Sequence, residues 1–250
     1  MKIDILTLFP GMFAPVMEES ILGRAKENKI LDIRLTDIRD YSQDKHKKAD
    51  DYPFGGGAGM VMMADPVFRA LEAVQAEGKR ILYMSPRGKT LNQELISDLA
   101  EEKEMVILCG HYEGIDERII EYWNMEEVSV GDYILTGGEL PAMILIDAVA
   151  RMVPEVLGSS KAHHEESIYS GLLEYPQYTK PREYRGIEVP EVLVSGHHKM
   201  IHLWQFEKSL ELTKERRPDL LTEYIKNTEF LTKDEKKILD KIMRSEDRND

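Results

Sequence analysis

Cysteine is nearly absent from the chain, which has one, Cys109, in 250 residues. A disulfide framework and a zinc centre built on several thiolates are therefore excluded. No apolar run approaches the roughly 20 residues that a membrane-spanning helix needs. The amino-terminal segment has an acidic residue at position 4 and no small-residue cleavage site, so it does not have the pattern of a signal peptide. We therefore expect a cytoplasmic protein that does not interact with a membrane.

Basic residues are outnumbered, with 33 Lys and Arg against 46 Asp and Glu, which gives a net charge of −13. Taken alone, this charge argues against nucleic acid as a partner. The excess of acid is confined to residues 1–170, which hold 18 basic and 30 acidic residues, whereas residues 171–250 hold 15 and 16. The near-neutral carboxyl-terminal part leaves room for local RNA-binding patches.

The first 150 residues alternate between strand-like and helix-like patterns. Helical spacing runs through residues 16–26, and Asp65 followed by Pro66 predicts a helix start, with a stop at Gly78. The segments predicted as strands are residues 2–8, 31–35, 80–84, 105–109 and 126–130. The last three are short apolar runs between helical stretches, which is typical of buried parallel strands. The pattern predicts an α/β domain with its ligand site beyond the carboxyl ends of the strands.

The sequence changes in character after residue 151. Residues 154–190 carry several prolines and little periodicity, and a helical period resumes at residues 198–217 and continues into a charged tail. We predict an α/β domain over residues 1–157, a linker over residues 158–175, and a small, mainly helical domain over residues 176–250.

Glycines mark the loops that follow the last three predicted strands. They lie at positions 110, 114, 131, 137 and 138, where the backbone turns sharply or approaches a neighbour closely. Three such loops at one edge of a parallel sheet predict a pocket lined by main-chain N–H and C=O groups, which suits a nucleoside. Any one of the loops taken alone is typical of a simple tight turn.

Other motifs favour less specific interpretations. Residues 88–90 read GKT, but Tyr83 stands where a phosphate-binding loop needs its first glycine. Residues 55–59 read GGGAG without opening a clear helix, which favours a flexible or substrate-contacting loop over a dinucleotide fingerprint. Cys109 ends an apolar strand and is interpreted as a small buried hydrophobe. His198 and His202 have metal-ligand spacing but no carboxylate motif between them, which favours surface or packing roles.

The strand-end loops carry a resemblance to a known family. The segments YMSP, CGHYEGIDER, VGDYILTGGELPAMILIDAVAR, GLLEYPQYTKP and VPEVLVSGHHKMIHLW closely resemble bacterial tRNA (guanine-N1-)-methyltransferases of the SPOUT superfamily. The similarity runs essentially end to end and includes PFGGGAGMVM. It implies methyl transfer from S-adenosylmethionine to N1 of the guanine immediately 3′ of the anticodon in tRNA.

The same resemblance implies a fold and an assembly. The α/β domain would hold a mostly parallel sheet with a deep trefoil knot, which is a rare exception to unknotted topology, followed by the small helical domain. The active site would be shared between the subunits of a homodimer, with the linker supplied by the partner chain and Arg151 on the other side. The positions implied to bind the cofactor are Tyr83, Ser85, Pro86, Gly110, Gly114, Val130, Gly131, Asp132, Tyr133, Ile134, Leu135, Gly137, Gly138 and Pro141.

The reaction requires a base to remove the guanine N1 proton and a cation to stabilise charge on O6. By motif position the base is Glu166, which stands where the family has Asp and is one methylene longer. The cation is Arg151, while Glu113, Tyr112 and Ser167 are implied to bind the substrate. From the residues alone, Glu166 reads as a solvated linker charge and Glu113 as a helix N-terminal carboxylate. Participation of Mg²⁺ in proton removal stays open.

Binding of tRNA would use local basic patches in both domains. The candidate phosphate contacts are Lys45, Lys47, Lys48, Arg182, Arg185, Lys199, Lys214, Arg216 and Arg217, and the target base would be extruded from its stack. A solubilising surface is the alternative for each of them. Two other functions remain open at this stage. One is a non-catalytic RNA- or nucleotide-binding module, and the other is a nucleotide-dependent oxidoreductase on a doubly wound sheet, which lacks its glycine fingerprint.

Overall fold

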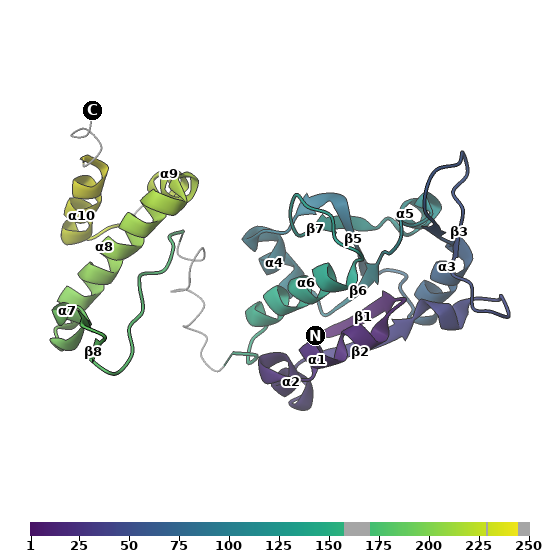
Figure 1. The fold of residues 1–250 in the computed structure, drawn as a ribbon, viewed down its shortest axis with the longest axis horizontal. Coiled ribbons are helices and arrows are strands. Elements are labelled where there is room, and N and C mark those ends of the chain that lie inside the picture. Colours follow the sequence, from purple (N-terminus) through teal and green to yellow (C-terminus); the bar gives the residue numbers. More distant parts are fainter. Residues whose placement is uncertain (158–170, 229, 245–250) are drawn as a thin grey trace. The chain divides into compact units, whose positions relative to one another are not determined.

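A computed structural model describes residues 1–157, 171–228 and 230–244 of the chain. The chain divides into two compact units, Met1–Ser160 and Lys161–Asp250 (Figure 1). The candidate base Glu166 and its neighbour Ser167 lie outside the described residues.

The first unit is built on a five-stranded sheet in which every neighbouring pair is parallel. In spatial order the strands are β2 (Asp32–Asp37), β1 (Lys2–Thr7), β6 (Glu104–Cys109), β5 (Arg80–Thr90) and β7 (Glu126–Ser129). The predicted α/β class is therefore confirmed, and each of the five predicted strand segments is a strand of this sheet. Threading of the chain into a knot stays a prediction.

Alternation along the strands explains why the sheet carries helices on both faces. Met105 and Ile107 of β6 belong to one hydrophobic cluster. Their neighbours Val106 and Leu108 belong to a second cluster. Because successive strand side chains point to opposite faces, a continuous apolar run buries both faces, and each such side chain contributes about 1.5–3 kcal/mol.

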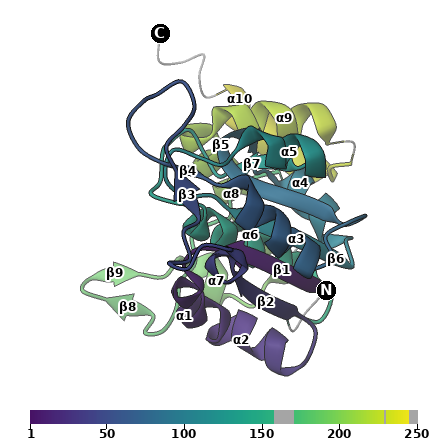
Figure 2. The ribbon, with the colours of Figure 1, turned by 90° about the vertical axis from the view of Figure 1, so that its right-hand side faces the viewer.

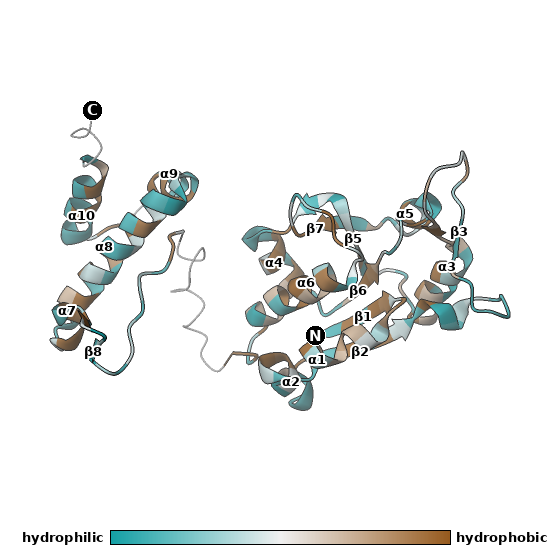
Figure 3. Cartoon of the chain, viewed as in Figure 1, coloured by the Kyte–Doolittle hydropathy of each residue, from teal (hydrophilic) through white to brown (hydrophobic). Residues whose placement is uncertain are grey.

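Two layers of helices cover the sheet. The first cluster packs β-strand side chains against α1 (Ala14–Met17), α2 (Ser20–Glu27), α4 (Gln93–Ala100) and α6 (Glu139–Met152). The second packs them against α3 (Ala64–Ala73) and α5 (Glu117–Trp123). Figure 3 shows the apolar colouring concentrated along the central strands and α6. The result is a three-layer unit whose strand ends are held rigidly.

Two local predictions for this unit are wrong. The helix expected over residues 16–26 is split into α1 and α2, and Ser20 at the break has a φ of 53°. The helix start predicted at Asp65 and Pro66 is confirmed to within one residue, because α3 begins at Ala64, and the Asp65 carboxylate accepts from Arg69 at 3.0 Å. The chain leaves α3 after Ala73, so Gly78, with a φ of 76°, turns the following loop rather than ending the helix.

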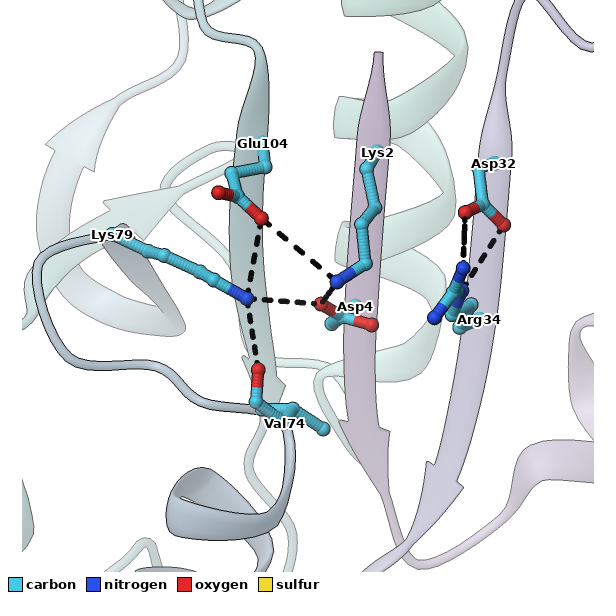
Figure 4. Close-up of polar contacts among 7 residues, drawn as sticks. All are labelled: Lys2, Asp4, Asp32, Arg34, Val74, Lys79 and Glu104. Carbon is cyan, nitrogen blue, oxygen red and sulfur yellow. Dashed lines mark hydrogen bonds and ion pairs between the residues drawn. The ribbon is translucent and has the colours of Figure 1, made fainter.

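A buried carboxylate joins groups near the amino-terminal ends of three neighbouring strands, β1, β6 and β5 (Figure 4). The Asp4 side chain on β1 is 3% exposed and lies 3.0 Å from the Lys2 ammonium and 3.5 Å from that of Lys79. Lys79 also reaches Glu104 of β6 at 3.3 Å and donates to the Val74 carbonyl at 2.8 Å. The hydrogen bond that the Lys2 ammonium donates to the Asp4 carboxylate raises the pKa of Lys2. This cluster fixes the loop that enters β5 to two other strands.

A second ion pair lies beside that cluster on the edge strand β2. Arg34 forms a bidentate pair with Asp32, in which Nε donates to Oδ1 at 3.2 Å and NH2 donates to Oδ2 at 2.7 Å. The Arg34 guanidinium lowers the pKa of Asp32. Both groups are largely exposed, so this pair contributes little to stability.

The second unit is a small helical domain. Its helices are α7 (Glu191–Val194), α8 (His198–Arg216), α9 (Pro218–Asn227) and α10 (Lys233–Arg244), with a short hairpin of β8 (Glu183–Tyr184) and β9 (Ile187–Glu188) (Figure 2). The core joins Leu210 of α8, Leu221 of α9 and Ile242 of α10 with Leu172. Buried Thr213 accepts from the Leu173 N–H at 2.8 Å, which anchors the chain entering this unit. Over the described ranges of both units, no helix is long and apolar enough to cross a membrane.

Candidate functional site

A cleft of about 440 Å³ opens at the carboxyl ends of β5, β6 and β7. Residues 83–87, 110–115, 128–131 and 133–138 line it together with Glu117, Ile120 and Pro141. Residues 110–115 and 130–138 follow β6 and β7, and residues 84–87 lie where the pairing of β5 with β7 shifts, level with the ends of those strands. The site therefore lies where ligands of such sheets bind. Its volume falls within the range of small-molecule sites in proteins.

The structure brings the predicted cofactor positions together in this cleft. All of them line it except Asp132, an exposed residue of the loop between Gly131 and Tyr133. The predicted substrate residues Tyr112 and Glu113 also line the cleft, but Arg151 does not.

Sequence reasoning missed several lining residues. They include Met84, Arg87, His111, Glu117 and Thr136. All of them lie within or next to the singled-out motifs, so proximity in sequence was the available signal.

Gly138 and Gly110 permit a close approach of two loops. The Gly138 N–H donates to the Gly110 carbonyl at 2.7 Å. A Cβ added at Gly138 would lie 2.8 Å from the Gly110 nitrogen and 2.9 Å from the Cys109 Cα, both of them backbone atoms. The bond between the β6 loop and the start of α6 therefore requires glycine at position 138, and it shapes one wall of the cleft.

The loop after β7 forms an exposed rim. Ser129 anchors its start, because its hydroxyl donates to the Gly131 carbonyl at 3.0 Å and accepts from the Gly131 N–H at 3.2 Å. The Tyr133 hydroxyl donates to the Val130 carbonyl at 3.2 Å. Ile134 follows with 79% of its surface exposed, so the rim presents apolar side chains beside main-chain polar groups.

Tyr83 supplies a protonated hydroxyl to the cleft. Burial, followed by the charge of Glu127, raises the pKa of Tyr83 to about 12. Its ring lies where a Cβ on Gly110 would fall, 2.7 Å from the nearest ring carbon. Tyr83 therefore stays a neutral hydrogen-bonding group at physiological pH.

Arg87 of β5 connects this strand to β7 and α5 at the acidic side of the cleft. Its Nε donates to Glu127 of β7 at 3.1 Å, and its NH2 nitrogen donates to Glu117 of α5 at 3.1 Å. Two carboxylates around one guanidinium leave this side with a net negative charge. Both Arg87 and Glu117 are more than half exposed, so these ion pairs add little to stability. Their effect is to hold the part of β5 that follows Met84 in place.

Tyr112 and Glu113 occupy a strained turn on the opposite wall. Tyr112 has a φ of 61°, in the left-handed region that non-glycine residues rarely adopt. The Glu113 N–H donates to the Met60 carbonyl at 3.0 Å, and a Cβ on Gly59 would lie 2.4 Å from the Glu113 Cγ. The glycine-rich loop between β3 (Asp50–Asp51) and β4 (Val61–Met62) therefore packs directly on the Glu113 side chain.

Arg151 lies in the last turn of α6, whereas Pro141, in the first turn, lines the cleft. Ten residues of helix separate them, which is about 15 Å along the axis. Within one chain, Arg151 is therefore about 15 Å along the helix axis from Pro141 and does not line the cleft.

The singled-out cysteine and histidines have structural surroundings. Cys109 is fully buried, and burial followed by the charge of Glu139 raises the pKa of its thiol well above the ordinary value. His202 pairs with Glu235 at 3.0 Å. Among residues 1–157, 171–228 and 230–244, no group of three or more His, Cys, Asp or Glu side chains could hold a metal ion.

Several predicted phosphate contacts are engaged within the chain. Lys47 pairs with Asp40, Lys48 with Asp51, Lys199 with Asp234 and Arg217 with Asp219, all within 3.0 Å. The half-buried Lys214 donates to the Ile242 carbonyl at 2.6 Å. Arg182, Arg185 and Arg216 are exposed in the second unit, and the Arg185 guanidinium lies over the Tyr184 ring at 5.3 Å.

Comparison with known proteins gives one consistent result. Residues 1–223 match the family described as tRNA (Guanine-1)-methyltransferase TrmD. A tRNA (guanine-N(1)-)-methyltransferase of Ruminiclostridium cellulolyticum is 56% identical over 224 residues, covering 88% of this chain and 96% of the relative. Proteins of the same name from Alkaliphilus oremlandii and Clostridium botulinum strain Hall are 51% and 53% identical, covering 97% and 96% of this chain and 98% and 97% of those proteins.

Proposed function

Because the chain belongs to the tRNA (guanine-1)-methyltransferase family, we propose that its cleft binds S-adenosylmethionine and that a second copy of the chain completes the site for the tRNA guanine. Family membership assigns the activity itself, which is transfer of a methyl group to N1 of a tRNA guanine. The guanine is the one immediately 3′ of the anticodon.

The observation that carries the proposal is the convergence of three strand-end loops on one cleft. Residues predicted separately in these loops line the same cavity of about 440 Å³. Main-chain groups at Gly110, Gly131 and Gly137 would read the polar edge of an adenine, and Ile134 and Leu135 would contact its faces. S-adenosylmethionine, when bound, supplies a methyl group made electrophilic by its sulfonium.

The chain's own residues then have to remove one proton and stabilise one developing negative charge. Guanine N1 carries a proton at neutral pH, and a carboxylate at position 166 is proposed to remove it. Glu113 would accept hydrogen bonds from the guanine N–H edge, and the strained Tyr112 turn would hold Glu113 in place. Arg151 would stabilise the charge that spreads to O6. Mg²⁺ has no role in the proposal.

Two observations on α6 favour a dimeric site. Arg151 does not line the cleft of its own chain, and about 15 Å of helix axis separates it from Pro141, which does. We therefore propose that it acts at the cleft of the partner, whereas the family resemblance implies a position opposite the partner's linker. Leu140 and Ile144 are 48% and 47% exposed and lie four residues apart, on one face of α6. That exposed apolar face is suited to contact a second copy.

The proposed tRNA surface is narrower than the sequence indicated. Lysines 47 and 48 are already paired with carboxylates, which leaves the exposed Lys45, Arg182, Arg185 and Arg216 as the stronger phosphate candidates. Near the cleft, the glycine-rich loop presents Tyr52 and Phe54, which are 77% and 101% exposed. Exposed aromatic rings beside a site that takes up an extruded base are suited to stack on neighbouring bases.

Methyl transfer to two tRNA transcripts tests the proposal. One carries guanine immediately 3′ of the anticodon, and the matched control carries adenine there and is otherwise identical. We expect incorporation of labelled methyl from S-adenosylmethionine into the first transcript only, at guanine N1. Binding of S-adenosylmethionine by folded protein without transfer would overturn the catalytic proposal in favour of a non-catalytic binding module.

A further inference from the structure

A carboxylate that the reaction scheme does not use is buried next to the cleft. Glu139 begins α6 and is 2% exposed. The Thr7 hydroxyl, from the end of β1, donates to Glu139 Oε1 at 2.8 Å. The same hydroxyl accepts from the Phe9 N–H at 2.9 Å, so its proton is directed at Glu139. The carboxylate is thus oriented by a residue 132 positions away in sequence.

The group facing this carboxylate is a histidine of the cleft lining. His111 Nδ1 lies 3.9 Å from Glu139 Oε2. Nδ1 is buried and has no hydrogen-bond partner in the structure, although the side chain as a whole is 25% exposed. The Phe9 ring packs on the imidazole with a centroid distance of 4.8 Å. A buried, unpaired ring nitrogen beside a carboxylate requires an explanation, because burying such a group without a partner is costly.

Glycine at position 137 keeps the gap between the two groups open. A Cβ there would lie 2.4 Å from Glu139 Oε2 and 2.6 Å from His111 Nδ1. Any side chain at this position would separate the two groups. A valine there would strike Glu139 and His111 before it reached a ligand.

We propose that His111 is a further ligand-binding residue of the methyl-transfer site and that Glu139 is its positioning residue. Glu139 Oε2 is placed to accept from Nδ1–H if the 3.9 Å gap shortens, and this would select the tautomer with an unprotonated Nε2. Because Nδ1 is buried, Nε2 is the nitrogen available to accept a hydrogen bond from an N–H or O–H of a bound ligand. The inference rests on the proposed function for the identity of that ligand, since S-adenosylmethionine and guanine both carry such donors.

The tautomer is measured on the free protein with ¹⁵N-labelled histidine, and the His111→Asn variant assigns the His111 signals. We expect the Nδ1–H tautomer in the wild type. In Glu139→Gln the amide can either donate or accept, so we expect a mixture of tautomers. Asp4→Asn is the matched control, because it neutralises another buried carboxylate at the opposite edge of the sheet, and it is expected to leave the His111 signals unchanged.

Ligand binding is measured on the same proteins. His111→Asn keeps a donor near Nδ1 but removes the acceptor at Nε2, and we expect binding of one ligand to weaken about three- to tenfold. His111→Gln, which places an amide near Nε2, is expected to recover part of that loss. Glu139→Gln is expected to add nothing in the His111→Asn background. If Glu139→Gln does not fold, Thr7→Val removes the orienting hydroxyl instead.

The outcomes separate this inference from the proposed function. A change in the affinity for S-adenosylmethionine assigns Nε2 to the methyl donor, and a change in the KM for tRNA assigns it to the guanine. Unchanged values for both ligands, or an Nε2–H tautomer in the wild type, would overturn the inference. Failure of the wild type to methylate tRNA would overturn the proposed function, while the tautomer result would stand.

Discussion

Replacing Gly138 by alanine tests whether the cleft wall depends on the contact between two backbones. The added Cβ would lie 2.8 Å from the Gly110 nitrogen and 2.9 Å from the Cys109 Cα. Optimal separations are about 3.5–4.0 Å, so one loop must move by about 0.5–1 Å. The atoms in the way are backbone, and Cys109 is fully buried at the end of β6, so the loop carrying Gly138 is the part expected to move.

We expect Gly138→Ala to lower the free energy of unfolding by about 1–3 kcal/mol, the usual range for overpacking. At about 3 °C per kcal/mol, thermal unfolding of this unit would fall by about 3–9 °C. The same movement displaces a cleft wall, so calorimetric titration is expected to show at least tenfold weaker binding of S-adenosylmethionine. Gly11→Ala is the matched control, because no atom lies within 4 Å of a Cβ added there. Wild-type affinity in Gly138→Ala would refute the reasoning.

Three further predictions concern single side chains. Because burial raises the pKa of Tyr83 to about 12, the unfolded chain ionises first as the pH rises above 10. Between pH 10 and 12, the free energy of unfolding of the wild type is therefore expected to fall by about 2–3 kcal/mol more than that of Tyr83→Phe. Equal pH dependence of the free energy of unfolding in the two proteins would contradict this. Asp4→Asn removes a carboxylate held between two lysines, so chemical denaturation is expected to show a loss of about 3 kcal/mol, with unchanged affinity for S-adenosylmethionine. Glu166→Gln is expected to abolish methyl transfer while cofactor affinity stays near wild type; retained turnover would place the base elsewhere, with Glu113 the next residue to test.

Features set by local patterns could be predicted from the sequence. The five strands are apolar or alternating runs of ordinary length, and the parallel arrangement followed from the helical stretches between them. The cleft positions at Gly110 and Gly138 could be predicted because their loops follow predicted strands, whereas Tyr83 was implied by the family resemblance of the YMSP segment. Strand ends at one edge of a parallel sheet necessarily lie close together.

Features set by distant partners could not be predicted in this way. Glu139 reads as an ordinary helix-start carboxylate until Thr7, from β1, is seen to orient it. Arg87 reads as a loop cation until Glu117 and Glu127 are placed around it. The break at Ser20 is likewise invisible to helical spacing, because the residues on both sides keep the same period. Such contacts are fixed by tertiary packing and carry no periodic signal.

Mixing two defective variants tests most directly the claim that the site is assembled from the cleft of one chain and Arg151 of the other. Glu113→Ala damages the cleft and Arg151→Ala removes the cation, so each protein alone is expected to lose most of its transfer to tRNA. Unfolding and refolding the two together in equal amounts makes half of the dimers mixed, and each mixed dimer has one intact site. The account predicts recovery to about a quarter of the wild-type rate. A mixture as inactive as its two components would contradict it.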